Sequence, residues 1–387
     1  MKHYYTDLHI HIGQSLDGKA VKITAAKTMN LPGVIQVARD IKGLAMIGVI
    51  DAQSQGVRKD FRTLLHEGVL QPLEGGGYAA QGLIIIPGTE IELSLGTGSA
   101  HFLAYFPTLN HLESYIHKLQ PYVKNWQLSS QKAHLGVEQW LEAVAAGEGI
   151  WLPAHAFTPH KGIYGNCCES LLDVLPGMPL ALEIGLSADR QMARSIRELG
   201  QVVLFSNSDA HSLPKIAREY NLLSLAEGSF LGLQELVYKV KGEVLANYGL
   251  PPVFGKYHRT YCLVCEKVVE GEPPLLECPA CGSRQVVMGV LDRLVSIADA
   301  EIPSEPDPRY VYQLPLKDLP GIGPKMVRNL LQHFGTEMNV LHQVPGEELV
   351  KVAGEKAARW IELSRQGKLL FQAGGGGVFG KVVDILS

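Results

Sequence analysis

Tyr4-Tyr5-Thr6-Asp7-Leu8-His9-Ile10-His11 is the stretch that decides the fold, because it joins an apolar strand pattern to two metal-binding side chains. His9 and His11 are two positions apart, so on a strand both imidazoles leave the same face. Asp209 and His211 repeat this spacing far along the chain. Histidine nitrogen and carboxylate oxygen suit zinc, manganese or iron. The two pairs therefore predict a metal site built from distant parts of the chain.

Short apolar runs recur between these two pairs, and helix-like stretches such as Leu112–Lys124, Gly136–Ala146, Leu171–Leu175 and Asp189–Leu199 separate them. Strands that alternate with helices predict parallel βαβ units, and about seven strands would close into a barrel rather than an open sheet. The runs are Tyr4–His11, Ala45–Asp51, Leu83–Glu90, His101–Phe106, Ile150–His155, Leu180–Ile184 and Val202–Asn207.

More ligand-type residues stand at the ends of these runs, namely Glu90, His101 and His155. The carboxyl ends of parallel barrel strands share one face, so we expect the histidines and carboxylates to converge there. A carboxylate shared between two ions is the usual way to hold them close enough for two-metal phosphoryl chemistry. Glu92, His160 and Glu183 would also lie near this rim, either as ligands or as supports.

The composition is that of a globular protein, with 46% hydrophobic and 19% charged residues among 387. The histidine-containing start does not resemble a signal peptide, and the apolar runs are strand-sized rather than membrane-spanning, so we expect a cytoplasmic protein without membrane contact. The formal charge of -4 gives no global indication of nucleic-acid binding. Contact with DNA would have to come from local groups.

Two proline-rich stretches divide the chain. Leu250-Pro251-Pro252-Val253 is the first, and Ile302–Pro308, with three prolines in seven residues, is the second. A run this rich in proline cannot form a regular helix or strand. We therefore expect a catalytic barrel over residues 1–250, a cysteine module over 251–300 and a helical tail over 301–387.

The cysteine module contains two C-x-x-C pairs, Cys262 with Cys265 and Cys278 with Cys281. Two such knuckles, twelve residues apart, complete a four-thiolate zinc site. A redox dithiol is the alternative, but no thioredoxin-like βαβ unit surrounds the pairs. All four ligands come from the protein, so we expect one structural zinc ion in a zinc ribbon.

The tail contains a glycine turn, Leu319-Pro320-Gly321-Ile322-Gly323-Pro324-Lys325, followed by the helical pattern Met326–Phe334. This is the helix-hairpin-helix signature, in which turn N–H groups and a helix N-terminus contact a phosphate. Val352–Lys356 with the helix Ala357–Arg365 looks like a second copy. A plain helical hairpin is the alternative for each copy. The predicted DNA contacts are Gly321, Gly323, Lys325, Arg328, Gly354, Lys356 and, from a barrel loop, Lys161.

The barrel motifs resemble those of the PHP (polymerase and histidinol phosphatase) superfamily: Asp7–His11, Gly88-Thr89-Glu90, Pro153-Ala154-His155 and Ser208–His211. The resemblance implies an α/β fold, a distorted (β/α)7 barrel, that carries two or three divalent cations (Zn, Mn, Mg or Fe). It places one cation at His9, His11, Glu90 and Asp209, and a second at Glu90, His101 and His155.

A third cation would use His211 with partners near Asp17 or Asp51. Here the chain departs from the superfamily pattern, because Ile50-Asp51-Ala52 stands where Thr-Asp-His is common. The third site would therefore be weak, absent or rebuilt by Asp51.

Barrel, ribbon and hairpin tail together resemble the endonuclease Q family over nearly the full length. Further support comes from Phe157-Thr158-Pro159, Gly185–Asp189 and Val378-Phe379-Gly380-Lys381. Membership implies an endonuclease that nicks duplex DNA 5′ to uracil, hypoxanthine, xanthine or an abasic site, leaving a 3′-hydroxyl and a 5′-phosphate. A sliding clamp is a further candidate partner.

Within that hypothesis, Asp209, Glu90 and His11 are the predicted catalytic residues, with Asp209 and Glu90 fixing the metals and helping to take a proton from water. A damaged base must leave the stack to be read, which is cheapest when it is mispaired or missing. The loop Phe157–Asn166 and Ser206-Asn207 follow ligand-bearing strands, so we expect Asn207, Ser206 and Tyr164 to line the base pocket.

Three other functions share parts of this pattern. A phosphatase of small phosphate monoesters would use the barrel and metals but has no need of the ribbon and tail. A non-catalytic DNA-binding scaffold would not need the metal-binding residues. An exonuclease like the PHP domains of bacterial replicative polymerases would cut from DNA ends.

Overall fold

The computed structural model describes residues 1–255, 257–303, 305, 307–372 and 380–383. Val378 and Phe379, part of the family pattern, lie outside the described residues, as do Ser304 and Pro306 of the second proline-rich stretch. No described helix is long and apolar enough to cross a membrane.

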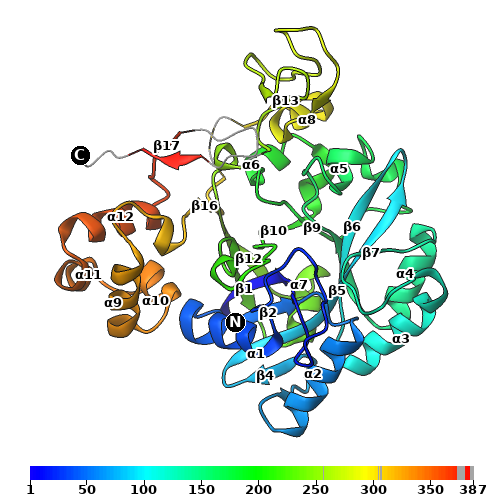
Figure 1. Ribbon diagram of the computed structural model, residues 1–387, viewed down its shortest axis with the longest axis vertical. Coiled ribbons are helices and arrows are strands. Elements are labelled where there is room, and N and C mark those ends of the chain that lie inside the picture. Colours follow the sequence, from blue (N-terminus) through cyan, green and yellow to red (C-terminus); the bar gives the residue numbers. More distant parts are fainter. Residues whose placement is uncertain (256, 304, 306, 373–379, 384–387) are drawn as a thin grey trace.

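All seven predicted apolar runs contain strands of one ring. In most of these runs the apolar residues are followed by polar residues, which lie at the rim of the ring. The ring closes through a parallel bridge between Ile10 and Ala210 and through the Ala156 N–H, which donates to the Glu183 carbonyl oxygen at 2.8 Å. The distorted (β/α)7 barrel is therefore confirmed (Figure 1). The strands are β1 (Lys2–Ile10), β2 (Met46–Val49), β5 (Leu83–Leu95), β6 (Gly98–Tyr105), β8 (Ile150–Pro153), β9 (Ala181–Glu183) and β10 (Val203–Phe205).

The expectation that every strand runs parallel is wrong for β6. The strands β1, β2 and β5 are mutually parallel, as are β9 and β10, but β6 is antiparallel to both β5 and β8. Only Gly96 and Thr97 separate β5 from β6, and so short a connection forms a hairpin rather than a crossover. His101 thereby lies opposite Glu92 within the sheet instead of at a carboxyl end.

The barrel sheet extends beyond the ring on both sides. On one side β11 (Tyr220–Leu225) pairs antiparallel with β1, β12 (Glu243–Gly249) with β11, and β16 (Tyr310–Tyr312) parallel with β12. On the other side lie β4 (Tyr78–Ala80) and β3 (Gln71–Pro72), while β7 (Gln131–Lys132) pairs with β5. The strand β16 belongs to the predicted tail, so the segment after residue 301 completes the barrel sheet before the tail helices begin.

Helices cover the outside of the ring. Four of those described begin at side-chain caps, because Asn30, Thr108, Asp189 and Ser229 accept backbone N–H groups of the first turn. The helix predicted over Asp189–Leu199 is interrupted, since Ile196 is extended. The helices are α1 (Leu31–Gln36), continued by a π-helical segment (Val37–Lys42), α2 (Gln55–His66), α3 (Leu109–Leu119), α4 (Val137–Ala146), α5 (Ile163–Asn166), α6 (Arg190–Ala193) and α7 (Phe230–Val237).

The cysteine module consists of three short strands and one helix: β13 (Tyr261–Cys262), β14 (Lys267–Val268), β15 (Val286–Val287) and α8 (Val290–Ile297). Among its described residues, the separate hydrophobic cluster of the module consists of Cys262, Val269 and Cys278. So small a core cannot hold a fold without a bound metal. Arg293 of α8 attaches the module to the barrel by donating to the carbonyl oxygens of Tyr164 (2.9 Å) and Cys168 (2.8 Å).

The tail is a bundle of four helices: α9 (Pro324–Phe334), α10 (Glu337–His342), α11 (Gly346–Ala353) and α12 (Glu355–Arg365), followed by the paired strands β17 (Phe371–Gln372) and β18 (Lys381–Val382). It lies against the barrel on one side, as Figure 1 shows. A buried ion pair joins Lys42 to Glu337, and the His342 ring stacks on Tyr5 with 4.7 Å between ring centres. The Tyr220 hydroxyl lies 2.7 Å from His342 Nε2.

Candidate metal centre

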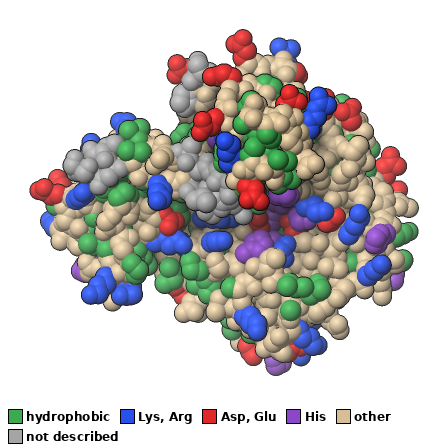
Figure 2. Space-filling view, turned by 45° about the horizontal axis from the view of Figure 1, so that its top comes forward, with side chains coloured by type: hydrophobic (Ala, Val, Ile, Leu, Met, Phe, Trp, Pro, Cys, Tyr) green, Lys and Arg blue, Asp and Glu red, His purple; other side chains and the backbone are tan. Residues whose placement is uncertain are grey.

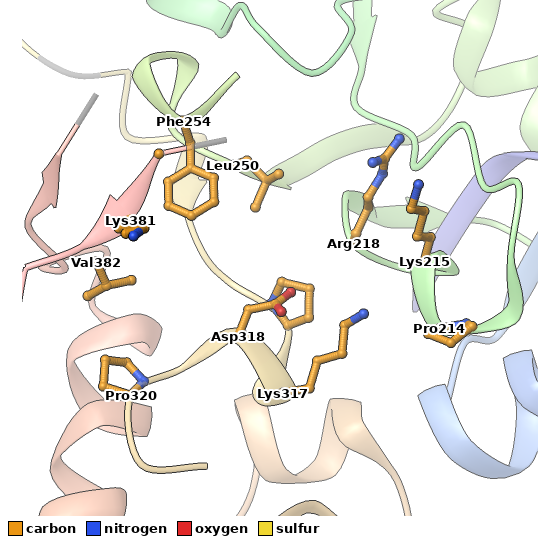
Figure 3. Close-up of a pocket in the computed structure, with 12 residues that line it drawn as sticks. Pro214, Lys215, Arg218, Leu250, Phe254, Lys317, Asp318, Pro320, Lys381 and Val382 are labelled. Atoms are coloured by element: carbon orange, nitrogen blue, oxygen red, sulfur yellow. The ribbon is translucent and has the colours of Figure 1, made fainter. Parts of the chain in front are cut away.

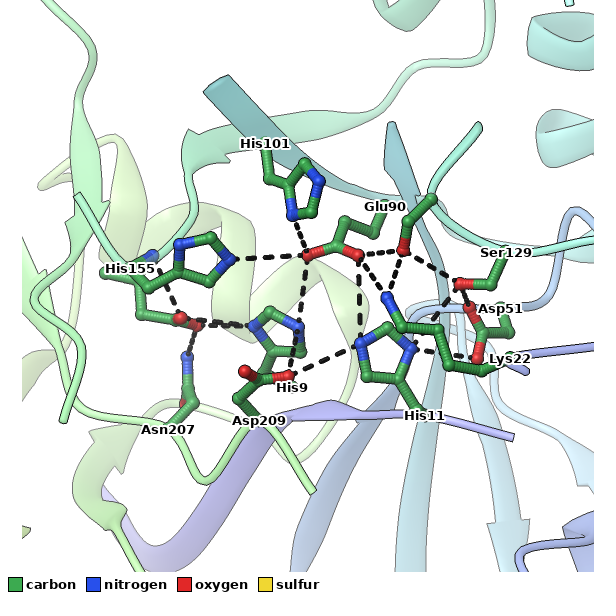
Figure 4. Close-up of polar contacts among 12 residues, drawn as sticks. His9, His11, Lys22, Asp51, Glu90, His101, Ser129, His155, Asn207 and Asp209 are labelled. Atoms are coloured by element: carbon green, nitrogen blue, oxygen red, sulfur yellow. Dashed lines mark hydrogen bonds and ion pairs between the residues drawn. The ribbon is translucent and has the colours of Figure 1, made fainter. Parts of the chain in front are cut away.

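His9 and His11 are the first two residues of a dense cluster of ligand-type side chains at the rim (Figure 4). The Nε2 atoms of both lie 3.4 Å from Asp209 Oδ1. They lie 3.5 and 3.7 Å from the two oxygens of Glu90. Ligands about 2.0–2.1 Å from a shared tetrahedral ion would be about 3.3 Å apart, so these spacings suit one cation.

The other nitrogen of each ring is held by a buried carboxylate. His9 Nδ1 lies 2.9 Å from Glu183 Oε2, and His11 Nδ1 lies 3.0 Å from Asp51 Oδ2. A carboxylate at Nδ1 keeps the proton there and leaves the Nε2 lone pair for a metal. Glu183 and Asp51 are therefore supports that orient the ligands.

Glu90 joins this group to a second one. Its Oε1 lies 3.0 Å from His101 Nδ1 and 3.6 Å from His155 Nε2. The ligand atoms of Glu90, His101 and His155 lie within 4.8 Å of one another, as do those of His9, His11 and Glu90. Although β6 runs antiparallel to its neighbours, it still places His101 in the ligand cluster around Glu90.

The residues present fit two cations. His9 Nε2, His11 Nε2 and His101 Nδ1 are buried and make no hydrogen bond, a costly arrangement unless another partner binds them. Burial alone would raise the pKa of Glu90, but His101 and Lys22 outweigh it and hold that pKa well below its usual value. Burial also opposes ionisation of Asp209, and His9 and His11 likewise keep its pKa well below normal. Both carboxylates are therefore anionic.

Two of these ligands have an unusual backbone. His155 has φ +29° and Asp209 has φ +45°, values that non-glycine residues seldom adopt. Asp7 stabilises the Asp209 loop, because its buried carboxylate accepts the N–H groups of Ser208 (3.1 Å) and Ala217 (3.0 Å). Burial raises the pKa of Asp7 to about 6. Asp7 belongs to the Asp7–His11 motif, but its sequence position alone does not indicate this supporting role.

Two of the residues predicted for a third cation, Asp17 and Asp51, interact with neighbouring protein groups. Asp17 accepts the Ser15 hydroxyl (2.6 Å) and pairs with Lys19 (3.4 Å), outside the cluster. Both oxygens of Asp51 are occupied, Oδ2 by His11 and the Ile12 N–H (2.7 Å), Oδ1 by the Ser129 hydroxyl. Among the described residues, the group of possible ligands that contains His211 therefore includes neither Asp17 nor Asp51. His211 does lie near His11 and Asp209.

The four cysteines of the ribbon converge as the sequence predicts. The Sγ atoms of Cys262 and Cys281 are 3.7 Å apart, and those of Cys265 and Cys278 are 3.9 Å apart. Thiolates about 2.3 Å from one tetrahedral zinc ion would be about 3.8 Å apart. The geometry fits a closed four-thiolate site.

Comparison with known proteins agrees with this geometry. No family model matches the chain. An uncharacterized protein of Bacillus subtilis, YqxK, is 40% identical over 391 residues, which cover 99% of this chain and all of YqxK. The crystal structure of PfuEndoQ, a lesion-specific endonuclease from Pyrococcus furiosus, superposes with a TM-score of 0.82 at 29% identity, covering 98% of this chain and 95% of that one. The chain belongs to the endonuclease Q family.

A second endonuclease Q structure is a complex with a 27-mer duplex substrate carrying an abasic lesion at the active site. It superposes with a TM-score of 0.81 at 29% identity, covering 98% of this chain and 96% of that one. Membership of the endonuclease Q family makes the protein a metal-dependent endonuclease of DNA repair.

A pocket of about 310 Å³ adjoins the metal centre of this endonuclease Q. Asp209 and His211 of the ligand cluster line it, and Thr158, His160, Ser187 and Tyr257 are among its other lining residues. The predicted loop Phe157–Asn166 thus contributes to the pocket, but not through Tyr164.

The predicted base contacts need correction. Tyr164 is buried and its hydroxyl donates to Glu198 Oε1 at 2.6 Å, and Ser206 is fully buried. Asn207 does line the pocket, but its amide donates to Glu183 Oε2 (2.9 Å) and its Oδ1 accepts the Leu8 N–H (3.0 Å). With both ends of its amide engaged, Asn207 stabilises the metal centre and is not a free base reader.

The predicted phosphate contacts of the tail are on the surface. Gly321 (φ +75°) and Gly323 have open space where a side chain would stand, and Lys325 and Arg328 beside them are exposed. Gly354 (φ +80°) forms a similar open turn before α12, with Lys356 exposed. Lys161, in contrast, pairs with Glu92 Oε1 at 2.8 Å.

A second, larger pocket of about 470 Å³ lies between barrel and tail (Figure 3). Lys215 and Arg218 line both pockets, and Lys317 and Lys381 line this one from the tail side. Figure 2 shows histidines gathered in a hollow at the middle of this face, with lysine and arginine side chains around it. A basic path therefore leads from the metal centre toward the tail.

Proposed function

We propose that this endonuclease hydrolyses duplex DNA at the phosphodiester on the 5′ side of a deaminated base or an abasic site. The products are a 3′-hydroxyl and a 5′-phosphate. The observation that carries the proposal is the pocket beside the ligand cluster, which shares Asp209 with it. A scissile phosphate at the cluster would put the neighbouring nucleoside at the mouth of this pocket, where a flipped base is received.

The catalytic roles follow from the positions of the side chains. His9, His11, Glu90 and Asp209 would hold one cation, and Glu90, His101 and His155 the other. Bound divalent cations supply Lewis acidity for the attack of water on a phosphodiester. The Asp209 side chain is 29% exposed and anionic, so it can accept the proton of the attacking water.

Neighbouring groups orient the substrate. Burial and the nearby His11 lower the pKa of His211 to about 4, so this pocket-lining imidazole stays neutral and donates or accepts a hydrogen bond. Arg218 is fixed by donating from Nε to the Ser208 carbonyl oxygen at 2.7 Å, which leaves its other guanidinium nitrogens near the phosphate path. The open turns at Gly321 and Gly354 suit sequence-independent contacts with the DNA backbone.

The test uses one duplex oligonucleotide with a central uracil, hypoxanthine, xanthine or abasic site, and an undamaged duplex as reference. The full-length protein is incubated with Mn²⁺, Mg²⁺ or Zn²⁺, and product ends are mapped on sequencing gels. We expect a single nick 5′ to the lesion. Asp209→Asn should abolish it, while Asp40→Asn, an exposed site paired with Arg39, should not. Cleavage only from ends, or release of phosphate from p-nitrophenyl phosphate without nicking, contradicts the proposal.

A further inference from the structure

Among the residues that the structure describes, too few ligands are present for the third cation that the PHP resemblance implies. The free donors on that side are His211 and the remaining oxygen of Asp209, because His11 Nε2 and Asp209 Oδ1 already face the first cation position. Both oxygens of Asp51 already accept hydrogen bonds and its side chain is fully buried, and Ala52 beside it offers no ligand atom. Two donors do not make a specific site for a divalent cation.

A lysine ammonium lies on the Asp51 side of the cluster instead. Lys22 Nζ is 3.1 Å from Glu90 Oε2 and donates to the Ser130 hydroxyl, and its side chain is only 14% exposed (Figure 4). Ser130 in turn donates to the same Glu90 oxygen. Glu90 therefore presents Oε1 to His101 and His155, and Oε2 to Lys22.

The backbone fixes Lys22 at this position. The Lys22 N–H donates to the Ile12 carbonyl oxygen (2.9 Å), and the Val21 N–H donates to the Gly13 carbonyl oxygen (2.9 Å). The Ala25 N–H donates to the Lys22 carbonyl oxygen (3.0 Å). The segment that carries Lys22 is thus tied directly to the residues that follow the His9 and His11 pair, and the low exposure of the side chain, 14%, keeps its ammonium at the rim.

We propose that the Lys22 ammonium, beside the two cation positions described above, supplies the positive charge that a third cation would bring. Lys22 is a positioning residue: it holds the second oxygen of Glu90 and neutralises part of the negative charge of the carboxylate cluster. A fixed ammonium cannot be removed by chelators or diluted away, unlike a weakly held ion. The expected effect on nicking rests on the proposed function, whereas the number of bound cations does not.

The first experiment counts cations on the full-length protein. The barrel is stripped with a chelator under conditions that keep the ribbon zinc, then dialysed against rising Mn²⁺, and metals are measured by mass spectrometry. We expect a plateau at two Mn²⁺ and one Zn²⁺ per chain. A plateau at three Mn²⁺ overturns the proposal. A protein that nicks no lesion but binds two Mn²⁺ refutes the proposed function alone.

The second experiment separates a charge from a structural support. Lys22→Met removes the charge at similar length, so Mn²⁺ should bind on the order of tenfold more tightly while nicking falls. Lys22→Arg should stay close to the natural protein in Mn²⁺ affinity and keep part of the activity. Lys19→Met, exposed on the same segment, is the matched control and should change neither. Weaker Mn²⁺ binding by Lys22→Met would mean that the lysine is only structural, and contradicts the proposal.

Discussion

Glu183→Gln is the substitution that tests the support of the metal centre most directly. The carboxylate accepts three donors: His9 Nδ1–H (2.9 Å), the His155 N–H (3.0 Å) and the Asn207 amide (2.9 Å). Glutamine has nearly the same shape but one acceptor oxygen, so one of its N–H groups must face a donor. If the amide nitrogen faces His9, the imidazole proton moves to Nε2 and the ligand atom is lost. If it faces His155, the strained backbone of that ligand loses its hydrogen bond.

The magnitude follows from these two outcomes. Loss of a carboxylate that orients a metal-binding histidine costs about 10- to 100-fold in metal affinity. This corresponds to about 1.4–2.8 kcal/mol of binding free energy. A buried donor without a partner costs a further 1–3 kcal/mol or so of folding free energy.

The assay is Mn²⁺ titration by calorimetry together with urea unfolding of the metal-free protein. Glu198→Gln is a matched control, because Glu198 also accepts three donors, from Tyr164, Ser170 and Leu171, none of which is a predicted metal ligand. Both variants should lose stability, and only Glu183→Gln should lose Mn²⁺ affinity. Equal Mn²⁺ affinity in the two variants would refute the reasoning.

Three further predictions concern the parts around the barrel. Burial lowers the pKa of His342 to about 4, so between pH 6.5 and 4 the unfolded chain binds a proton that the folded one does not, and stability falls as pH drops. Between pH 7.5 and 5, His342 should lower the free energy of unfolding measured by urea titration by about 2 kcal/mol. This loss should be absent in His342→Phe, and the same pH dependence in both proteins would contradict the prediction. Arg293→Ala should raise KM for lesion DNA several-fold with Mn²⁺ content unchanged, because it removes the hydrogen bonds that join the ribbon to Tyr164 and Cys168 of the barrel. Arg284→Ala, at an exposed position, should not raise KM, and equal KM values in the two variants would speak against this role of Arg293. Lys325→Ala should weaken binding to damaged and undamaged duplexes alike and lower the salt dependence of log Kd by about one; a lesion-specific loss argues against a backbone contact.

Residue type and spacing made the barrel strands and the clustering of ligand-type side chains predictable. His9, His11 and Asp209 combine a period-two spacing with apolar strands, and the cysteine pairs have a spacing that few other structures use. These signals are local, because each motif lies within a few residues. The pairing partners of the strands are not local, which is why the antiparallel course of β6 was not foreseen, although the glycine at position 96 fits a tight hairpin.

The roles of supporting residues could not be predicted from local patterns. Lys22 lies in a segment without strand or helix periodicity, and its contact with Glu90 spans 68 positions. Asn207 was expected to face the substrate because it follows a ligand-bearing strand. Its amide instead connects Glu183 to Asn221, whose Nδ2 donates to Asn207 Oδ1 at 3.0 Å. Position after a strand predicts proximity to the rim, but the direction of a hydrogen-bonding side chain depends on partners elsewhere in the fold.

The pairing of β16 with β12 constrains how this gene could exchange parts with others. Asp307, just before β16, accepts the Arg190 guanidinium at 2.9 Å, and the Arg190 side chain is 8% exposed. A recombination junction near residue 300 would leave the buried Arg190 guanidinium without its counter-ion. It would also expose β12 as an edge strand, which promotes self-association. A viable fusion of this catalytic unit to another binding module should therefore join after Tyr312, so that β16 stays in the same chain as the barrel sheet that it extends.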